Sequence, residues 1–266
     1  MDRNDRPRTL KTVEHTCGIL NLIKELDGVR VTELAEHLDM SKGGVYNHLA
    51  TLRDQEFVVK EGDEYRLSSH FFNLGEYVKH NNPLYRVGKE EVENLAGETG
   101  ESTHLMVEQF GKGFYYHKSR VQKGIAQEYH LNLMEEPDYL HWSSTGKAVL
   151  AEMPESRVRG ILDDRGTPEI TQHTITDPDE LLAELETVSE RGYALNDEEQ
   201  IRGVRAIGTA VTDRDDTVLG AISVSGPTSR INDEKFYDIY PELVLQTKNV
   251  IEVNIETRGG QNTPPL

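Results

Sequence analysis

Apolar positions between residues 31 and 67 recur first at helical and then at strand spacing. A short helix is expected after Thr32, its N-cap, and Ser41 is expected to cap a second helix after a tight turn. The apolar residues that would face a core are Leu34, Ala35 and Leu38 in the first helix and Val45, Leu49 and Leu52 in the second. Two short amphipathic helices joined this tightly are typical of a helix-turn-helix.

Two strand-like segments follow these helices. Residues 57–59 and 65–67 flank the turn sequence at 61–63, Glu-Gly-Asp, and this pattern predicts a β-hairpin, or wing. Helix, turn, helix and wing in this order favour a winged helix-turn-helix DNA reader over a simple helical hairpin.

No large or acidic side chain obstructs the outward face of the second helix, which suits a surface that meets DNA. This face consists of Gly43, Gly44, Asn47, Ala50 and Thr51, with Tyr46 and His48 flanking the apolar stripe. Asn47 offers a donor and an acceptor that match an adenine edge, and the wing supplies cations for phosphates. An interaction module would instead carry an apolar stripe on this face. The predicted DNA-binding residues are Ser41, Lys42, Gly43, Tyr46, Asn47, His48, Thr51, Lys60 and Arg66.

The remaining periodicity predicts a leading helix, a linker helix and an α+β domain. An apolar stripe over residues 13–26 ends at Gly28, and Cys17 on that stripe is expected in the core. Residues 71–78 have helical spacing up to Pro83, where we expect a linker to end. The expected helices at 84–96, 144–153, 155–162 and 178–191, with one around Pro241, are segregated from expected strands at 103–107, 114–117, 204–211 and 218–224.

These patterns divide the chain into a winged helix-turn-helix domain at 1–70, a linker helix at 71–83, an α+β domain at 84–258 and a disordered tail at 259–266. No apolar run could span a membrane and no signal peptide is evident, so we expect a cytoplasmic protein. The single cysteine excludes an internal disulfide.

The formal net charge of −18 is concentrated in the α+β part of the chain. Residues 1–70 carry 10 basic and 13 acidic residues, whereas residues 71–266 carry 19 and 34. A high acidic load with only 12 lysines among the 29 basic residues is similar to proteins from salt-in archaeal halophiles.

Motifs for catalysis, cofactors and metals are incomplete. Residues 144–147 imitate a phosphate loop but are followed by Ala148 instead of a hydroxyl residue, and no HExxH or GxSxG sequence occurs. A zinc site built from His104, His117 and carboxylates is conceivable, but sheet histidines with ordinary hydrogen bonds are the favoured interpretation. The acidic residues around Asn196 are expected to form a solvated helix-capping turn. We therefore predict no catalytic residue, cofactor or metal.

A polar strand gives a clearer signal for a small molecule. Ser223 and Ser225 would face one side of a strand while Ile222 and Val224 face the other. Two hydroxyls on one sheet face can hydrogen-bond a carboxylate or a hydroxyl group. A merely polar outer face accounts for the same pattern.

Several motifs together resemble the IclR family of transcriptional regulators. They are HWSSTGKAVLA at 141–151, TITDP at 174–178, RGYALNDEE at 191–199, GVRAIG at 203–208 and AISVSGP at 221–227. The resemblance implies an N-terminal winged helix-turn-helix and a C-terminal GAF-like α+β domain with an antiparallel sheet. It also implies binding of operator DNA and a small effector, a homodimer or tetramer, and no catalysis.

The resemblance further implies an effector pocket, although Asn196 stands where an acid is common and Ala206 where a cysteine is common. The implied pocket residues are Ser144, Thr145, Asn196, Val204, Ala206, Ser223 and Ser225. The sequence thus predicts a regulator whose DNA binding responds to a hydroxylated acid or sugar-derived metabolite. The alternative is a zinc-dependent sensor or an enzyme that uses the same pocket, with the winged domain as an interaction module.

Overall fold

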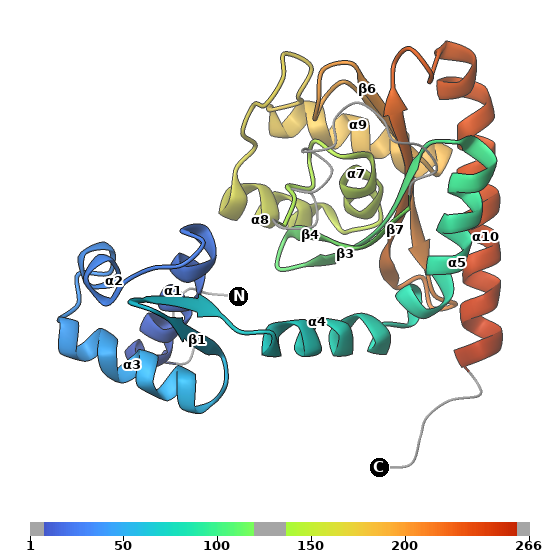
Figure 1. Cartoon of the computed structure of the whole chain (residues 1–266). Helices are drawn as coiled ribbons and strands as arrows, with labels where there is room; N and C mark the ends of the chain where they lie inside the picture. The colour runs from blue at the N-terminus through green and yellow to red at the C-terminus, as the bar shows by residue number, and fades with distance from the viewer. Residues whose placement is uncertain (1–7, 120–136, 260–266) are drawn as a thin grey trace. The chain divides into compact units, whose positions relative to one another are not determined.

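The computed structural model describes residues 8–119 and 137–259, and the chain divides into two compact units, residues 1–78 and 79–266 (Figure 1). The expected N-terminal arm and C-terminal tail lie largely outside the described residues. No helix in the described ranges is long and apolar enough to cross a membrane.

Unit 1 is a winged helix-turn-helix, as predicted. Its elements are α1 (Lys11–Glu25), α2 (Val31–His37), α3 (Lys42–Asp54), β1 (Val58–Glu61), β2 (Glu64–Leu67) and the start of α4 (His70–Asn81). The predicted stripe of α3 is buried against α1 and α2. Strands β1 and β2 pair antiparallel around a two-residue turn, which confirms the wing.

Two details of unit 1 were predicted wrongly. The Cys17 side chain is exposed, because the face of α1 that packs inward is centred on Ile19 and Ile23. Thr32 is not the N-cap of α2; the helix begins at Val31, and the Glu33 carboxylate accepts a hydrogen bond from the Arg30 N–H at 2.8 Å. The carboxylate of a glutamate in the third helical position, and not a threonine hydroxyl, therefore accepts a hydrogen bond from a backbone N–H at the start of the helix.

Helix α4 runs across the boundary between the units and contains no buried residue. Phe71 packs on Phe57 near the start of the helix, with ring centroids 5.4 Å apart. Farther along, Phe72, Leu74 and Tyr77 are exposed to solvent. The helix ends where Asn82 caps α5 (Pro83–Thr99).

Unit 2 contains a five-stranded antiparallel sheet in the order β4-β3-β7-β6-β5. The strands are β3 (Ser102–Gln109), β4 (Lys112–Ser119), β5 (Ala194–Asp197), β6 (Val204–Thr212) and β7 (Val218–Pro227). Helices α5 and α10 (Tyr240–Gly259) cover one face, and α7 (Ser144–Ala151), α8 (Glu155–Arg165) and α9 (Pro178–Arg191) lie on the other (Figure 1). A short π-helix at Lys235–Ile239 leads into α10.

Alternation along β7 separates an apolar core from a polar face. Ile222 and Val224 are buried in the core beneath α5 and α10. Ser223 and Ser225 face the opposite side of the sheet and line a pocket there. The predicted alternation is confirmed, and it places the two serines on the face that also carries α7.

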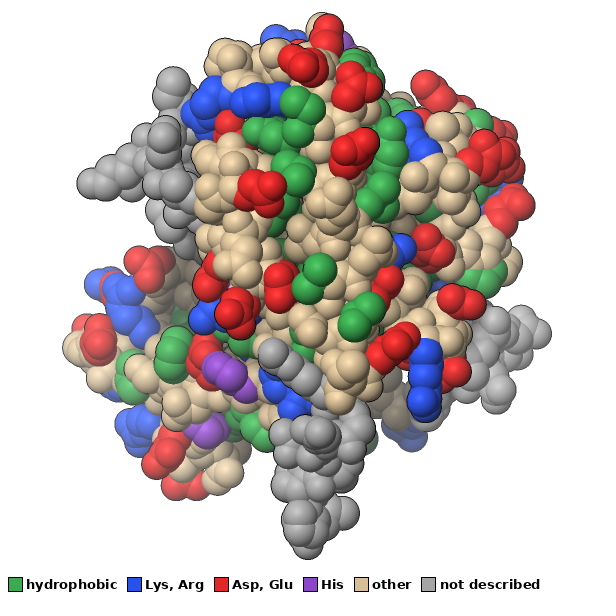
Figure 2. Space-filling model, turned by 90° about the vertical axis from the view of Figure 1, so that its right-hand side faces the viewer, with side chains coloured by type: hydrophobic (Ala, Val, Ile, Leu, Met, Phe, Trp, Pro, Cys, Tyr) green, Lys and Arg blue, Asp and Glu red, His purple; other side chains and the backbone are tan. Residues whose placement is uncertain are grey.

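Acidic side chains are distributed over the α10 side of unit 2. On the side of α10, Asp and Glu are spread among apolar and neutral residues instead of forming one patch (Figure 2). Such a distribution keeps like charges apart while maintaining a high total charge.

Candidate functional site

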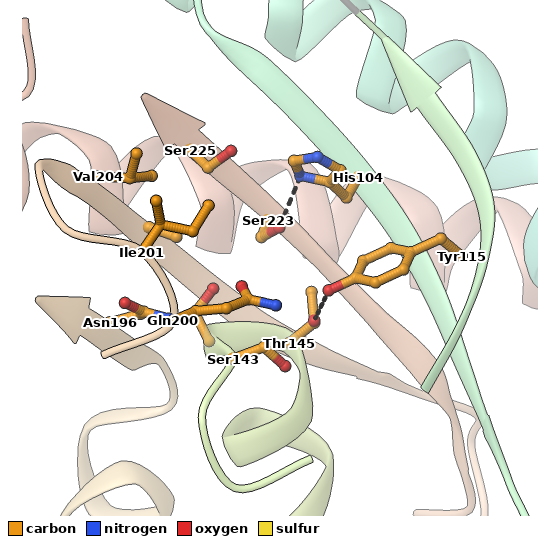
Figure 3. Close-up of a pocket in the computed structure, with 12 residues that line it drawn as sticks. His104, Tyr115, Ser143, Thr145, Asn196, Gln200, Ile201, Val204, Ser223 and Ser225 are labelled. Carbon is orange, nitrogen blue, oxygen red and sulfur yellow. Dashed lines mark hydrogen bonds between the residues drawn. The ribbon is translucent and has the colours of Figure 1, made fainter. Parts of the chain in front are cut away.

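A polar pocket lies on the face of the sheet that carries α7 (Figure 3). The free space that the described residues leave in it is about 30 Å³, at least enough for a water molecule. The lining residues are His104, Tyr115, Ser143, Ser144, Thr145, Asn196, Gln200, Ile201, Val204, Ala206, Ser223 and Ser225.

The N-terminus of α7 forms one wall because Gly208 allows it to approach the sheet closely and Gly146 allows it to pack on Leu140. A Cβ at Gly208 of β6 would lie 2.8 Å from the Ser144 carbonyl carbon, and a Cβ at Gly146 would overlap the Leu140 carbonyl oxygen. Ser143 caps the helix by accepting a hydrogen bond from the Gly146 N–H at 3.1 Å. The N-terminus of α7, which carries the positive end of the helix dipole, thus lines the pocket.

Strands β3 and β7 supply the opposite wall. The register pairs His104 with Ser223, and the Ser223 hydroxyl lies 3.3 Å from His104 Nδ1. Ser225 is two residues further along the same face. Figure 3 shows these side chains across the pocket from Asn196 and Gln200. Both serine hydroxyls can donate or accept hydrogen bonds.

The side-chain amide of Asn196 forms hydrogen bonds within the protein through both its nitrogen and its oxygen. Its Nδ2 donates to the Trp142 carbonyl at 2.6 Å, and its Oδ1 accepts from the Glu199 N–H at 3.0 Å. The segment that contains Asn196 is not the solvated turn that was expected. Residues 194–197 form edge strand β5, and both Asn196 and Glu199 are buried.

A buried ion pair lies beneath this wall. Lys147 is 1% exposed, and its ammonium contacts the two carboxylate oxygens of Glu199 at 2.6 and 2.8 Å. Burial raises the pKa of Glu199, whereas the positive charge of Lys147 acts to lower it. Thr174 adds a hydrogen bond of 2.7 Å to the Glu199 carbonyl. These contacts join α7 to the 196–201 segment.

Asp138 lies behind the pocket and connects three aromatic or amide side chains. Its carboxylate accepts hydrogen bonds from the Trp142 indole, from Tyr115 Oη at 3.1 Å and from Gln200 Nε2 at 2.8 Å. Burial raises the pKa of Asp138 to about 6, although all three hydrogen bonds act to lower it. The pKa of Tyr115 is raised chiefly by burial and then by the Asp138 charge.

The structure brings all seven residues of the expected effector pocket together around one space. Sequence reasoning missed five further lining residues, which are His104, Tyr115, Ser143, Gln200 and Ile201. No signal in the local sequence connects them, because they come from β3, β4, the start of α7 and the turn after β5.

A zinc site on His104 and His117 is not supported. His104 faces the pocket, whereas His117 lies on the opposite face of the sheet and contacts Glu93 of α5 at 3.0 Å. Within residues 8–119 and 137–259, no group of three or more His, Cys, Asp or Glu side chains could hold a metal ion.

In unit 1, the expected DNA-reading residues of α3 lie largely on one exposed face. Tyr46 is 56% exposed, Asn47 and Thr51 are exposed, and nothing lies within 4 Å of a Cβ built on Gly43. Lys42 is likewise exposed. The Ser41 hydroxyl is used as the predicted N-cap of α3 and accepts from the Gly44 N–H at 3.1 Å.

The three remaining residues expected to contact DNA differ in exposure and in the contacts that they make within unit 1. His48 turns toward α1, where its Nδ1 lies 2.8 Å from Thr16 Oγ1. Lys60 of the wing is exposed, with its ammonium 5.8 Å from the centre of the Tyr65 ring. Arg66 is surrounded by carboxylates. This environment favours a structural role for Arg66 over a phosphate contact.

Comparison with known proteins covers both units. Residues 76–252 match the description "Bacterial transcriptional regulator IclR C-terminal", and residues 12–62 match the IclR helix-turn-helix domain. The probable HTH-type transcriptional regulator ArcR of Halobacterium salinarum is 36% identical over 255 residues, which cover 96% of this chain and 97% of that protein. The HTH-type transcriptional regulator KdgR of Dickeya chrysanthemi is 30% identical over 254 residues, covering 94% and 81%.

A solved structure supports the same fold. Thermotoga maritima IclR superposes with a TM-score of 0.71 at 24% identity, covering 93% of this chain and 99% of that one. A winged helix-turn-helix joined to an α+β domain of this kind defines a class of DNA-binding transcriptional regulators. The chain belongs to the IclR family of transcriptional regulators. Its relatives are named as regulators and not as enzymes. The similarity to a protein of Halobacterium salinarum is consistent with the halophile-like composition.

Proposed function

We propose that the pocket of unit 2 binds a small hydroxylated acid or a sugar-derived metabolite, and that this binding modulates attachment to operator DNA. The observation that carries the proposal is the convergence of Ser223 and Ser225 with the N-terminus of α7 around one space. Hydroxyls and helix-terminal amides together suit a ligand with hydroxyl and acidic groups. Ser223 lies beside His104 in the pocket, but relatives with this domain are named as regulators and not as enzymes, which favours binding over turnover.

We propose further that α3 reads bases through Tyr46, Asn47 and Thr51, with Lys42 and Lys60 on phosphates. Their exposure supports this assignment. A protein with this task works where the DNA lies, in the cytoplasm of a prokaryotic cell. A symmetric dimer would let two winged units read two half-sites.

The double variant Ser223→Ala/Ser225→Ala tests the effector site. Removing two hydroxyl partners is expected to weaken ligand binding by about 1–3 kcal/mol, while DNA binding without ligand stays nearly unchanged. Calorimetry measures the first quantity, and promoter-fragment binding with and without ligand measures the second. An unaltered ligand response would place the sensing site elsewhere. Thr187→Ala, on the exposed side of α9, is a matched loss of one hydroxyl outside the pocket.

A further inference from the structure

We propose that Asp138, behind the pocket, makes the site selective for ligands that donate hydrogen bonds, and therefore for hydroxy acids over the matching oxo acids. The inference rests on the proposed effector site and adds the residue that sets its chemistry. Asp138 is a positioning residue, because it acts through Tyr115 and Gln200, which line the pocket.

The position of Asp138 is fixed by the backbone as well as by its side chain. Its N–H and C=O both pair with Gly113 of β4 at 2.8 Å. The Trp142 indole N–H, which can only donate, is bonded to Oδ1, and Tyr115 and Gln200 are bonded to Oδ2. With a pKa of about 6, the carboxyl group is mostly ionised at pH 7 and acts as an acceptor only.

An acceptor in this place determines what Gln200 and Tyr115 offer to a ligand. Gln200 turns its NH₂ group to Asp138, so its carbonyl oxygen is left on the pocket side of the amide (Figure 3). Tyr115 uses its only proton for the bond to Asp138, and its oxygen is bonded to the hydroxyls of Thr145, at 3.4 Å, and Ser143. Gln200 therefore presents acceptor lone pairs to the pocket, and Tyr115 has no proton to offer a ligand.

A ligand group that meets the Gln200 carbonyl oxygen has to supply a proton. A hydroxyl group can do so, whereas a carbonyl oxygen would leave two acceptors facing each other without a hydrogen bond. The hydroxyls of Thr145, Ser223 and Ser225 rotate and adapt to either kind of group, so they do not discriminate. The contacts of Asp138 with Tyr115 and Gln200 thus determine the selectivity between a hydroxy acid and its oxo counterpart.

The test uses the full-length protein with two matched pairs of probes, lactate with pyruvate and gluconate with 2-oxogluconate. Trp142 is the only tryptophan in the chain, and its indole is bonded to Asp138, so tryptophan fluorescence reports binding directly. One hydrogen bond made or lost corresponds to about a tenfold change in Kd. We expect the unaltered protein to bind the hydroxy member of a pair about tenfold more tightly than its oxo counterpart.

The isosteric variant Asp138→Asn is expected to shift the preference toward the oxo acid. The amide that replaces the carboxylate would accept from Trp142 through its oxygen and donate its NH₂ group to Tyr115 and Gln200. Gln200 could then turn its own NH₂ group, and Tyr115 its proton, toward the ligand. Asp164→Asn is the matched control, because Asp164 is an exposed aspartate of α8, and it should keep the original preference.

A second variant keeps the test decisive if circular dichroism shows that Asp138→Asn does not fold. Gln200→Met retains Asp138 but removes one acceptor, and it should reduce the preference for the hydroxy acid. Either folded variant with an undiminished preference would overturn the inference. An oxo-acid preference of the unaltered protein would also overturn it while leaving the effector site standing. Binding of neither pair would reject the proposed ligand class itself.

Discussion

At the scale of single residues, the ion pair of Lys147 and Glu199 holds two pocket walls together. Lys147→Met would leave the Glu199 carboxylate buried without its cation, which is expected to cost about 3–5 kcal/mol of stability. Urea unfolding followed by circular dichroism measures the loss. Replacing both residues by methionine should recover most of it, because no buried charge remains.

Lys248→Met is the matched control for this prediction. Lys248 forms a partly exposed pair with Glu252 of α10 at 3.7 Å, and removing it is expected to cost less than about 1 kcal/mol. Equal losses of unfolding free energy in Lys147→Met and Lys248→Met would contradict the prediction that a buried ion pair matters more than an exposed one.

Asp138 also predicts a pH dependence of stability. Its pKa is about 6 in the folded protein and 3.8 in an exposed chain, so between these values the folded state holds a proton that the unfolded state has lost. The free energy of unfolding should therefore fall as pH rises from about 4 to about 6, by up to about 3 kcal/mol for this group. Asp138→Asn should lack this contribution when its unfolding is compared with that of the unaltered protein across the range. Parallel curves for the two proteins would contradict the prediction.

Asn47 is the residue on which the proposed DNA reading depends most. Asn47→Ala is expected to cost about 1–3 kcal/mol of operator affinity and to relax specificity at one base pair. Lys60→Ala, by contrast, should weaken binding to all sequences alike and reduce the salt slope by about one. Binding measured on an operator and on single-base variants of it separates these two outcomes. A uniform loss for Asn47→Ala would argue against base contact.

At the scale of elements, α4 exposes an apolar face that unit 1 does not cover. Leu74, Tyr77 and Val78 lie within about 100° of one another around the helix and are 42%, 70% and 50% exposed. We expect this face to pack against α4 of a second copy, since an isolated helix with such residues exposes them to water. Leu74→Glu should shift a dimer toward monomer, as light scattering at micromolar concentration would show.

Phe72→Glu adds the same charge on the opposite side of α4, about 160° around the helix from Leu74, and serves as the control. It should leave the oligomeric state unchanged. A monomer in the unaltered protein would remove the proposed seam.

Elements with strong periodicity could be predicted from the sequence, and the pocket only in part. The alternation along β7 was sufficient to orient Ser223 and Ser225, and the stripe of α3 was sufficient to orient its outer face. Strand β5 was missed because four residues rich in polar side chains have little strand propensity and depend on pairing with β6. The Asp138 arrangement was missed because its partners lie 23 and 62 residues away in the sequence.

At the scale of the whole molecule, the net charge of −18 predicts how salt affects folding and DNA binding. Self-repulsion should unfold the protein in dilute buffer, whereas molar KCl shortens the screening length to about 3 Å and relieves it. Operator affinity should depend only weakly on KCl, because few basic residues are available to displace counterions. Circular dichroism and DNA binding across a KCl series measure both effects. A steep slope together with good stability in dilute buffer would contradict this prediction.

The burial of Lys147 and Glu199 protects their ion pair from changes in the salt concentration around the protein. Ions shorten the reach of every charge at the surface, including those around Arg66, but they do not enter a site where the cation is 1% exposed. Over the range of salt in which the protein stays folded, the strength of this pair therefore does not depend on salt concentration. The walls of the pocket keep their spacing while the surface charges respond to salt.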